Sequence, residues 1–429
     1  MNYTLTEARC PCGIQVGGVH LPERKLVKVI LQFAGGLGHD DPAQRGVQRM
    51  AAELMNKGTA KRSMQDFADA LDATGSSVQV HIDHEATEVE ISCLSEFLTP
   101  TLELAAEMLL TPAYPEAQVT VAKSLALQRL RAIEDQPAQK MGILLGELAF
   151  GPAMGAHGLG TPESIATITR DDVTDAWRKF FRNDNMKVAI AGNYASAKVL
   201  DQLEKLFTPF VAPAGAIDPP EAAALPLDAR ETFFEKDCEQ SAMGVSLVCL
   251  PPADPKHAVE TVLNNIMSGG FSARLFSEVR EKRGLCYWCS SHYEYRRKNG
   301  RFALAAGTTP ERAHETMEVM LAELARLAKD LAPEELERAR TIVVNKTTLG
   351  RERTGRFADH AAWDLFHFGR IRQPDERIDD IRKVTLEDVK EYVAALDLSR
   401  RAIVTVGRKV DAQAAKAAAG KSKKSAPAQ

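Results

Sequence analysis

Apolar and polar positions follow two periodicities along this chain, and both recur in its second half. Residues 87–94 and 300–306 alternate between apolar and polar side chains, which is the period of a half-buried strand. Each is followed by apolar residues at i, i+3 and i+4, over about 100–110 and 310–327, the pattern of a helix with one buried face. The repeated succession predicts an α+β protein.

A short internal repeat indicates that the two halves are homologous. Residues 165–173 read IATITRDDV and residues 381–389 read IRKVTLEDV, an offset of 216 residues with Ile, Thr, Asp and Val identical. A helical stretch follows each copy, and then an apolar run that ends in Gly192 or Gly407. We therefore expect two homologous halves, each a mainly antiparallel sheet covered by helices.

Composition changes place the boundaries between the expected domains. Residues 1–208 form the N-terminal half, and residues 209–228, rich in Ala and Pro, form a linker. Residues 229–410 form the C-terminal half, and residues 411–429, rich in Ala, Lys and Ser, are expected to be a disordered tail.

The overall composition narrows the class of protein. Its 429 residues carry a net charge of -4, with 45% apolar and 26% charged residues, so nothing in the whole chain points to nucleic acid or to a membrane surface. The N-terminus lacks the basic start and apolar core of a secretory signal. Seven cysteines, an odd number, favour free thiols in a reducing compartment. We expect a cytoplasmic protein, or a periplasmic one whose signal has been removed.

Residues 41–59 are predicted to form a helix with an apolar inner side, starting at Asp41 and Pro42 and ending at Gly58. This segment resembles the zinc-site helix of the pitrilysin and insulinase family of H-x-x-E-H metallopeptidases. Aligned through the Lys-Gly-Thr that follows, the chain has Arg49 and Glu53 in place of the two zinc-binding histidines. Ala52 stands in place of the catalytic glutamate.

These replacements remove the chemistry that the resemblance implies. Two histidines four residues apart can hold one zinc ion, and the glutamate between them deprotonates the metal-bound water. An arginine stays protonated and cannot ligate, and an alanine cannot act as a base. The family's third ligand falls on Gln128 or Arg129. We therefore expect no metal cofactor in this chain and a weak ion pair between Arg49 and Glu53.

Other candidate metal ligands are more ambiguous. His81 and His84 lie on an alternating segment, where they would face opposite sides. The Cys286/Cys289 and Cys10/Cys12 pairs have metal-like spacing, yet each lacks a clear second pair at the spacing of a zinc knuckle. Structural thiols are favoured for both pairs, and a metal site is the alternative.

Residues 264–287 match the same family most closely, through a glycine pair and then E-V-R-E-K-R-G-L-x-Y. The resemblance implies that Arg280 orients the substrate and that the Tyr287 phenol stabilises the oxyanion, opposite a zinc that can belong to another subunit. Gly269 and Gly270 would let a peptide backbone approach, or simply form a turn. From pattern alone, Arg280 could equally be a solvated charge and Tyr287 a core aromatic.

Two functions follow from this resemblance. The first is a non-catalytic subunit of a two-chain zinc metallopeptidase. It would form a heterodimer with a zinc-containing H-x-x-E-H homologue and bind unfolded peptides in a shared chamber. The alternative is a catalytically inert structural or binding protein of the same fold. A peptidase that acts alone is disfavoured by the missing zinc motif.

Overall fold

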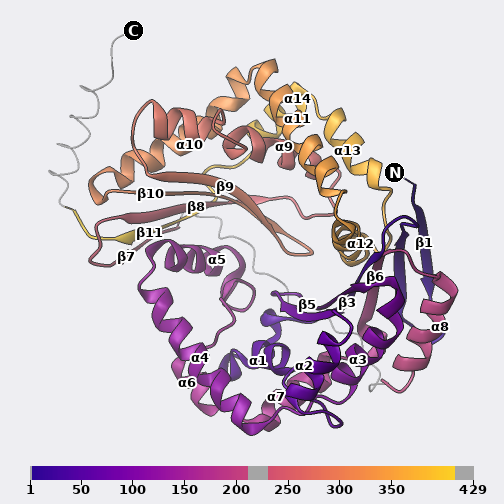
Figure 1. The fold of residues 1–429 in the computed structure, drawn as a ribbon. Helices are drawn as coiled ribbons and strands as arrows, with labels where there is room; N and C mark the ends of the chain where they lie inside the picture. Colours follow the sequence, from indigo (N-terminus) through magenta and orange to yellow (C-terminus); the bar gives the residue numbers. More distant parts are fainter. Residues whose placement is uncertain (1, 211–229, 411–429) are drawn as a thin grey trace. The chain divides into compact units, whose positions relative to one another are not determined.

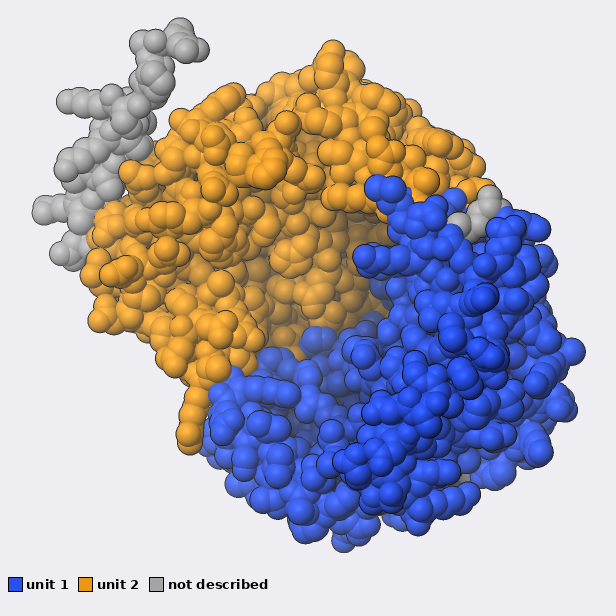
Figure 2. Space-filling model, viewed as in Figure 1, with its two compact units in different colours: residues 1–130, 157–220, 349–374 blue, residues 131–156, 221–348, 375–429 orange. Residues whose placement is uncertain are grey.

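The computed structural model describes residues 2–210 and 230–410, which form two compact units (Figures 1 and 2). As far as they are described, residues 1–130, 157–220 and 349–374 make up the first unit, and residues 131–156, 221–348 and 375–429 the second. Nearly all of the predicted linker and the whole predicted tail lie outside the described residues.

The first unit is built on a six-stranded sheet in the order β1-β2-β6-β3-β5-β4. Its strands are β1 (Thr4–Arg9), β2 (Gln15–His20), β3 (Leu26–Ala34), β4 (Ser77–Ile82), β5 (Ala86–Leu94) and β6 (Met186–Gly192). Every neighbouring pair is antiparallel except β2 and β6, which run parallel. The sheet is therefore mainly antiparallel, as the alternating segments predict.

The second unit repeats this topology in a five-stranded sheet ordered β7-β11-β8-β10-β9. Its strands are β7 (Arg230–Glu235), β8 (Ser241–Cys249), β9 (Trp288–Tyr295), β10 (Gly300–Thr308) and β11 (Arg401–Gly407). Again a single pair is parallel, β7 with β11, which occupies the place of β2 with β6. The two sheets match strand for strand apart from the extra edge strand β1, which confirms two homologous α+β halves.

The internal repeat corresponds to a helix start that is built the same way twice. Thr169 begins α7 (Arg170–Phe180) and Thr385 begins α14 (Leu386–Ala395), each as the residue that caps the helix. In both cases the threonine hydroxyl accepts from the backbone N–H three residues on, and the aspartate there, Asp172 or Asp388, accepts from the threonine N–H. These reciprocal bonds satisfy donors that a helix end leaves free.

Helices that follow the strands in sequence cover one face of each sheet (Figure 1). In the first unit α3 and α8 share a core with the strands, and in the second unit α9, α10 and α14 do so. The bounds of the helices in these two cores are α2 (Met64–Asp72), α3 (Leu98–Leu110), α8 (Ser196–Phe207), α9 (His257–Ser268), α10 (Ala313–Asp330), α11 (Pro333–Gly350) and α13 (Pro374–Lys383). Helices α1 (Val47–Leu54), α4 (Glu116–Glu134) and α6 (Pro162–Thr167) pack with α7 in a separate core of the first unit.

The opposite face of each sheet is covered by a helix that comes from the other half of the sequence. Helix α5 (Pro137–Gly155) shares a core with β8, β10 and β11, and α12 (Thr354–Phe368) shares one with β2, β3 and β6. Small residues let these helices approach closely, because a Cβ added at Gly244 would lie 2.5 Å from the Met141 sulfur. The compact units are thus the two sequence halves with one helix exchanged in each direction.

Polar contacts fix each exchanged helix in place. Lys28 of β3 binds Asp359 of α12 at 2.7 Å. In the second unit the Arg296 guanidinium donates to the carbonyl of Met154, at the end of α5, over 2.7 Å. Burial would raise the pKa of Glu294, but the charges of Arg301 and Arg296 hold it at about 2.

No helix within the described part of the chain is both long and apolar enough to cross a bilayer.

Candidate functional site

Helix α1, which carries the erased zinc motif, is shorter than the sequence predicts. Gly46 precedes it at φ +98°, where a Cβ would lie 2.7 Å from the Leu159 carbonyl, so the chain turns sharply there. The Asp40 carboxylate accepts from the N–H groups of Gly46 and Gln48 at 2.7 and 3.1 Å. The predicted start at Asp41 is therefore wrong: Asp41 caps a separate 3₁₀ turn, Pro42–Gln44.

The inner side of α1 is buried as predicted, against α4, α6 and α7. The Tyr114 hydroxyl also donates to the Ala51 carbonyl of this helix at 3.0 Å. Burial raises the pKa of Asp40 to about 6, although its two backbone hydrogen bonds and the charges of Arg49 and Arg45 act in the opposite direction. The backbone of α1 is thus firmly held, by packing and by a carboxylate that is costly to ionise.

The three positions that correspond to the family's zinc ligands converge on α1 and α4, where they form an ion-pair cluster. The Arg49 guanidinium lies 3.4 Å from the Glu53 carboxylate, which confirms the predicted ion pair. Glu53 also receives the Arg129 guanidinium at 2.9 Å, so of the two candidates for the third position Arg129 is the one that contacts α1 in the structure. Arg49 donates further to the carbonyls of Gly158 and His157 at 3.2 and 3.3 Å.

This cluster does not fit a zinc ion. Two guanidinium groups surround the single carboxylate, and neither can supply a ligand atom. Ala52, at the position of the catalytic base, is 1% exposed and carries no titratable group. Among the residues that the structure describes, the one group of three or more metal-ligating side chains lies elsewhere in the first unit. The positive charge that a metal would supply here comes from two arginines.

In the second unit, the predicted glycine pair lies at the end of α9. Gly269 ends this helix with its N–H on the Asn265 carbonyl at 2.8 Å, and a Cβ there would lie 2.5 Å from that oxygen. Gly270 is exposed, and a Cβ there would meet nothing within 4 Å. The first glycine is thus needed for the turn, whereas the second leaves open space above the backbone.

Arg280 lies on a π-helix, Leu275–Glu281, a feature that the sequence pattern does not reveal. Its neighbours in the charge run are paired: Glu278 binds Lys282 and Arg283 at 2.7 and 2.9 Å. Arg280, by contrast, is exposed and forms no ion pair with any described residue, and its guanidinium lies 5.0 Å from the centre of the Phe276 ring. One unpaired cation in a paired run is a candidate for ligand binding.

The backbone between Arg280 and Tyr287 is tightly anchored. Gly284 adopts φ +58° and its N–H bonds to the Arg280 carbonyl at 3.0 Å, as the glycine that ends a helix typically does. The Gly284 carbonyl accepts from Arg312 at 2.6 Å, and the Tyr287 N–H donates to the Gly307 carbonyl at 2.8 Å. The side chain of Tyr287 is nevertheless 55% exposed, so it is not a core aromatic.

An exposed aromatic side chain that the sequence analysis did not single out extends this surface. Phe271 follows the glycine pair, is 83% exposed and lies edge-on to Phe276 with 5.1 Å between ring centres. An apolar residue directly after two glycines was the available signal. Phe271, Phe276, Arg280 and Tyr287 form what we call the Arg/Tyr surface. Together they offer apolar rings, a cation and a phenol.

Two thiols flank Tyr287. Cys286 and Cys289 are hydrogen-bonded to each other, which raises the pKa of Cys286 and lowers that of Cys289. The charge of Arg280 opposes the rise in the pKa of Cys286 and adds to the fall in that of Cys289. The structure thus brings Arg280, Cys286, Tyr287 and Cys289 together within the second unit, whereas Arg49, Ala52 and Glu53 belong to the first.

Comparison with known proteins agrees with this division. Residues 18–153 match the insulinase family (peptidase family M16), and residues 167–343 match the peptidase M16 inactive domain. The chain belongs to the M16 peptidase family. Its first M16 match contains the ion-pair cluster on α1, and its second contains Arg280 and Tyr287.

Individual M16 relatives resemble the chain over nearly its whole length. An uncharacterized zinc protease of Streptomyces coelicolor is 28% identical over 96% of this chain and 92% of its own length. A crystal structure from Pseudomonas fluorescens, described as a peptidase M16 inactive domain, has a TM-score of 0.84 at 22% identity and covers 95% of this chain and 98% of its own. A protease from Helicobacter pylori has a TM-score of 0.87 at 17% identity, covering 95% and 100%. These two solved structures support the fold.

Proposed function

We propose that this chain is the non-catalytic subunit of a two-chain zinc metallopeptidase. It would pair with a homologous H-x-x-E-H subunit that holds the zinc, and bind unfolded peptide with its Arg/Tyr surface. The observation that carries the proposal is the exposed, unpaired state of Arg280 and Tyr287 on an anchored backbone, in a chain whose own zinc positions are filled by an ion-pair cluster.

The chemistry of the Arg/Tyr surface suits a peptide under attack by water. The Tyr287 hydroxyl can donate a hydrogen bond to the oxyanion that forms on the scissile carbonyl. The Arg280 guanidinium can donate charge-assisted bonds to a neighbouring carbonyl or carboxylate and so fix the register of the peptide. Phe271 provides an apolar contact for a peptide side chain, and the open space above Gly270 leaves room for its backbone.

The fixed backbone that carries Arg280 and Tyr287 also favours binding. An exposed side chain on a mobile loop would lose conformational entropy when it binds, whereas the backbone here is already fixed through Gly284 and Tyr287. A donor held in place before the reaction stabilises developing charge more effectively than one that must reorganise.

The partner and the cellular location are parts of the same proposal. The zinc would belong to the partner subunit, because the residues of this chain at the corresponding positions do not fit a metal. The expected location is the cytoplasm, or the periplasm if a signal has been removed. The alternative function, a catalytically inert structural or binding homologue, makes Arg280 and Tyr287 inherited features without a catalytic role.

Co-purification followed by mutation tests the proposal. The tagged chain is isolated from its native cells, the bound H-x-x-E-H homologue is identified, and peptide cleavage by the complex is measured with and without a chelator. We expect chelator-sensitive cleavage, and Tyr287→Phe to lower kcat by about 100-fold, the typical cost of one lost oxyanion donor. Arg280→Gln should mainly raise KM, because it removes substrate binding.

The controls separate catalysis from assembly. Tyr287→Phe retains the ring, so the amount of partner that co-purifies should stay the same. Arg178→Gln removes an exposed cation on α7 that pairs with Asp175, and should leave kcat and KM unchanged. Normal turnover by the Tyr287→Phe complex would eliminate the oxyanion role, and a chain that recruits no homologue would favour the inert alternative.

A further inference from the structure

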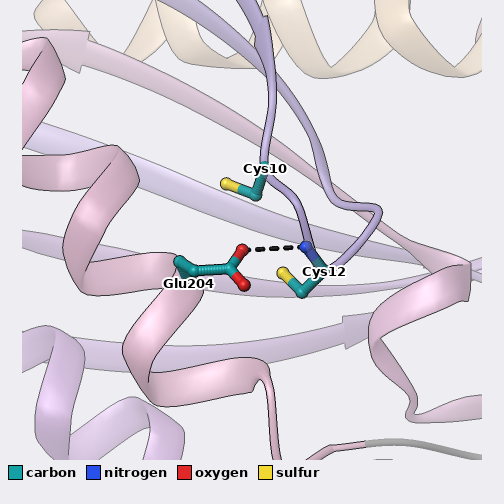
Figure 3. Close-up of side chains that lie close together, drawn as sticks. All are labelled: Cys10, Cys12 and Glu204. Carbon is teal, nitrogen blue, oxygen red and sulfur yellow. Dashed lines mark hydrogen bonds between the residues drawn. The ribbon is translucent and has the colours of Figure 1, made fainter.

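The first unit contains a second cluster of charged and ligating side chains, in and beside the turn between β1 and β2. Cys10, Pro11, Cys12 and Gly13 form this turn, which is closed by bonds from the Cys10 N–H to the Ile14 carbonyl and from the Gly13 N–H to the Cys10 carbonyl, both 2.9 Å. Gly13 adopts φ +99°. The turn brings the two cysteines to one side of the hairpin (Figure 3).

Glu204 of α8 supplies a third group, from a residue 192 positions away from Cys12. Its carboxylate accepts from the Cys12 N–H at 2.8 Å and from the Thr208 hydroxyl at 3.0 Å. The two sulfur atoms and a carboxylate oxygen all lie within 4.8 Å of one another (Figure 3). Within the described part of the chain, this is the one such convergence of three metal-ligating side chains.

We propose that Cys10, Cys12 and Glu204 bind a zinc ion that ties the β1–β2 hairpin to α8. Two thiolates and one carboxylate match the ligands that zinc prefers. A tetrahedral zinc with Zn–S bonds of about 2.3 Å places two sulfurs roughly 3.8 Å apart, so the side chains need to close by at most about 1 Å. Rotation about their own bonds can supply that movement.

The surroundings agree with a cation at this place. Cys10 is 3% exposed, whereas Cys12 and Glu204 are half-buried, so the site has one inner ligand and an open side where water can complete the tetrahedron. Arg9, the cation next to the turn, bonds to the Gly13 carbonyl at 3.2 Å.

Glu204 adds the third ligating group that the Cys10/Cys12 pair lacks in the sequence. The hydrogen bond from the Cys12 N–H explains why an acceptor is needed at this turn, but it does not require two thiols beside it. A carboxylate from α8 and two thiols from the β1–β2 turn make a three-ligand set, which the cysteine spacing alone lacks.

This site is independent of the proposed function and has a practical consequence for it. Zinc found in the isolated chain would be assigned to Cys10, Cys12 and Glu204, and it would not indicate peptidase activity at α1. Conversely, loss of this zinc would leave the Arg/Tyr surface in the second unit intact. Failure of either proposal therefore leaves the other standing.

Zinc titration of the full chain tests the site. The chain is reduced, stripped with a chelator and titrated anaerobically with zinc in competition with a chromophoric chelator. We expect one equivalent per chain, and at least about 100-fold weaker binding in Cys12→Ser, since even outer-shell partners of metal ligands are worth 10- to 100-fold. Cobalt should give a thiolate-to-metal charge-transfer band that Cys12→Ser abolishes.

Matched variants show whether the effect is specific. Glu204→Gln keeps an oxygen that can accept from the Cys12 N–H, so its fold is retained while zinc binds at least about 10-fold more weakly. Cys238→Ser, Glu53→Gln and the pair Cys286→Ser with Cys289→Ser should each keep the full equivalent of zinc. Absence of saturable binding would overturn the proposal. So would zinc that persists in Cys12→Ser and Glu204→Gln, or zinc that disappears with Cys286 and Cys289.

Discussion

The α1 ion-pair cluster and the Arg/Tyr surface differ in whether their side chains are bound to other side chains of the protein. At α1 the charged side chains of Arg49, Glu53 and Arg129 bind one another. On the Arg/Tyr surface, Arg280 stays without an ionic partner among the described residues and Tyr287 stays exposed, although the backbone around them is fixed. The charged side chains at α1 are thus bound to each other, whereas Arg280 and Tyr287 remain accessible, as the proposed function requires.

This difference explains why one region is read as structural and the other as functional. A half-exposed ion pair contributes only about 0–1 kcal/mol to stability, so the α1 cluster mainly avoids leaving charges unpaired near a buried helix. Glu278, the carboxylate of the same charge run, is bound to Lys282 and Arg283 and lies two residues from Arg280, a spacing that does not bring two helical side chains together. Natural sequences depart from such local pairing chiefly at functional sites.

Restoring the ligands at α1 should produce the largest change. In a Cys12→Ser background, the combined variant Arg49→His, Ala52→Glu, Glu53→His and Arg129→Glu is expected to go from no zinc at α1 to one equivalent per chain. The reason is that positions 49, 53 and 129 already converge on a backbone held by Asp40 and Tyr114. Zinc titration measures the gain.

The same variant without Arg129→Glu is the control, because two histidines alone should bind zinc more weakly. If the full variant folds and yet takes up no zinc, then the α1 backbone differs from a metal-binding one. The contrast between the two regions would in that case extend beyond side chains.

Stability should respond to pH through α1 more than through the Arg/Tyr surface. The turn at Gly284 is held through neutral carbonyl groups, whereas the start of α1 is held by Asp40, whose pKa burial raises to about 6 from 3.8. The folded state therefore binds this proton more tightly than the unfolded state, and the contribution of Asp40 to stability falls as pH rises from about 4 to 6. Asp40→Asn should remove about 1–2 kcal/mol of that fall.

Urea denaturation at several pH values measures this difference between wild type and variant. Asp172→Asn is the control of opposite sign: the Thr169 hydrogen bonds lower the pKa of Asp172, so its stabilisation is present above the usual pKa and is lost as pH falls. Equal pH dependence in wild type and Asp40→Asn would mean that Asp40 is not buried from solvent as the structure shows.

Local sequence patterns predicted many of the helices and strands, but they could not predict contacts between segments far apart in the sequence. The buried side of α1 and the ion pair between Arg49 and Glu53 depend on neighbours within a few residues, and the structure confirms both. The exchange of α5 and α12 could not be predicted, because the apolar residues of a helix do not indicate which of two similar sheets they will cover.

The same limit applied to the sites. The sequence left the third α1 position open between Gln128 and Arg129, and only the packing of α4 on α1 shows that Arg129 reaches Glu53. It left the Cys10/Cys12 pair without a partner because Glu204 approaches from a distant helix. The π-helix beneath Arg280 was also missed, since the extra residue of a π turn changes backbone hydrogen bonds without altering the apolar pattern.

The smallest expected effect is a change in the reactivity of Cys289, which reports on the position of Arg280 in the isolated chain. The hydrogen bond from Cys286 lowers the pKa of Cys289, and the nearby Arg280 charge lowers it further. Arg280→Gln should raise that pKa and slow alkylation of Cys289 by iodoacetamide near neutral pH by about 2- to 5-fold, because the thiolate is the reactive form. Mass spectrometry of the Cys289 peptide over time gives the rate.

Lys282→Gln is the matched control, since it removes an exposed cation of the same run that is bound to Glu278. It should leave the rate at Cys289 unchanged. If Arg280→Gln also left that rate unchanged, the guanidinium would point away from the thiols and from Tyr287, and the two side chains could not act on one peptide. A slower rate in Arg280→Gln alone would show that the cation sits beside Tyr287 before any substrate or partner is bound, as preorganised binding requires.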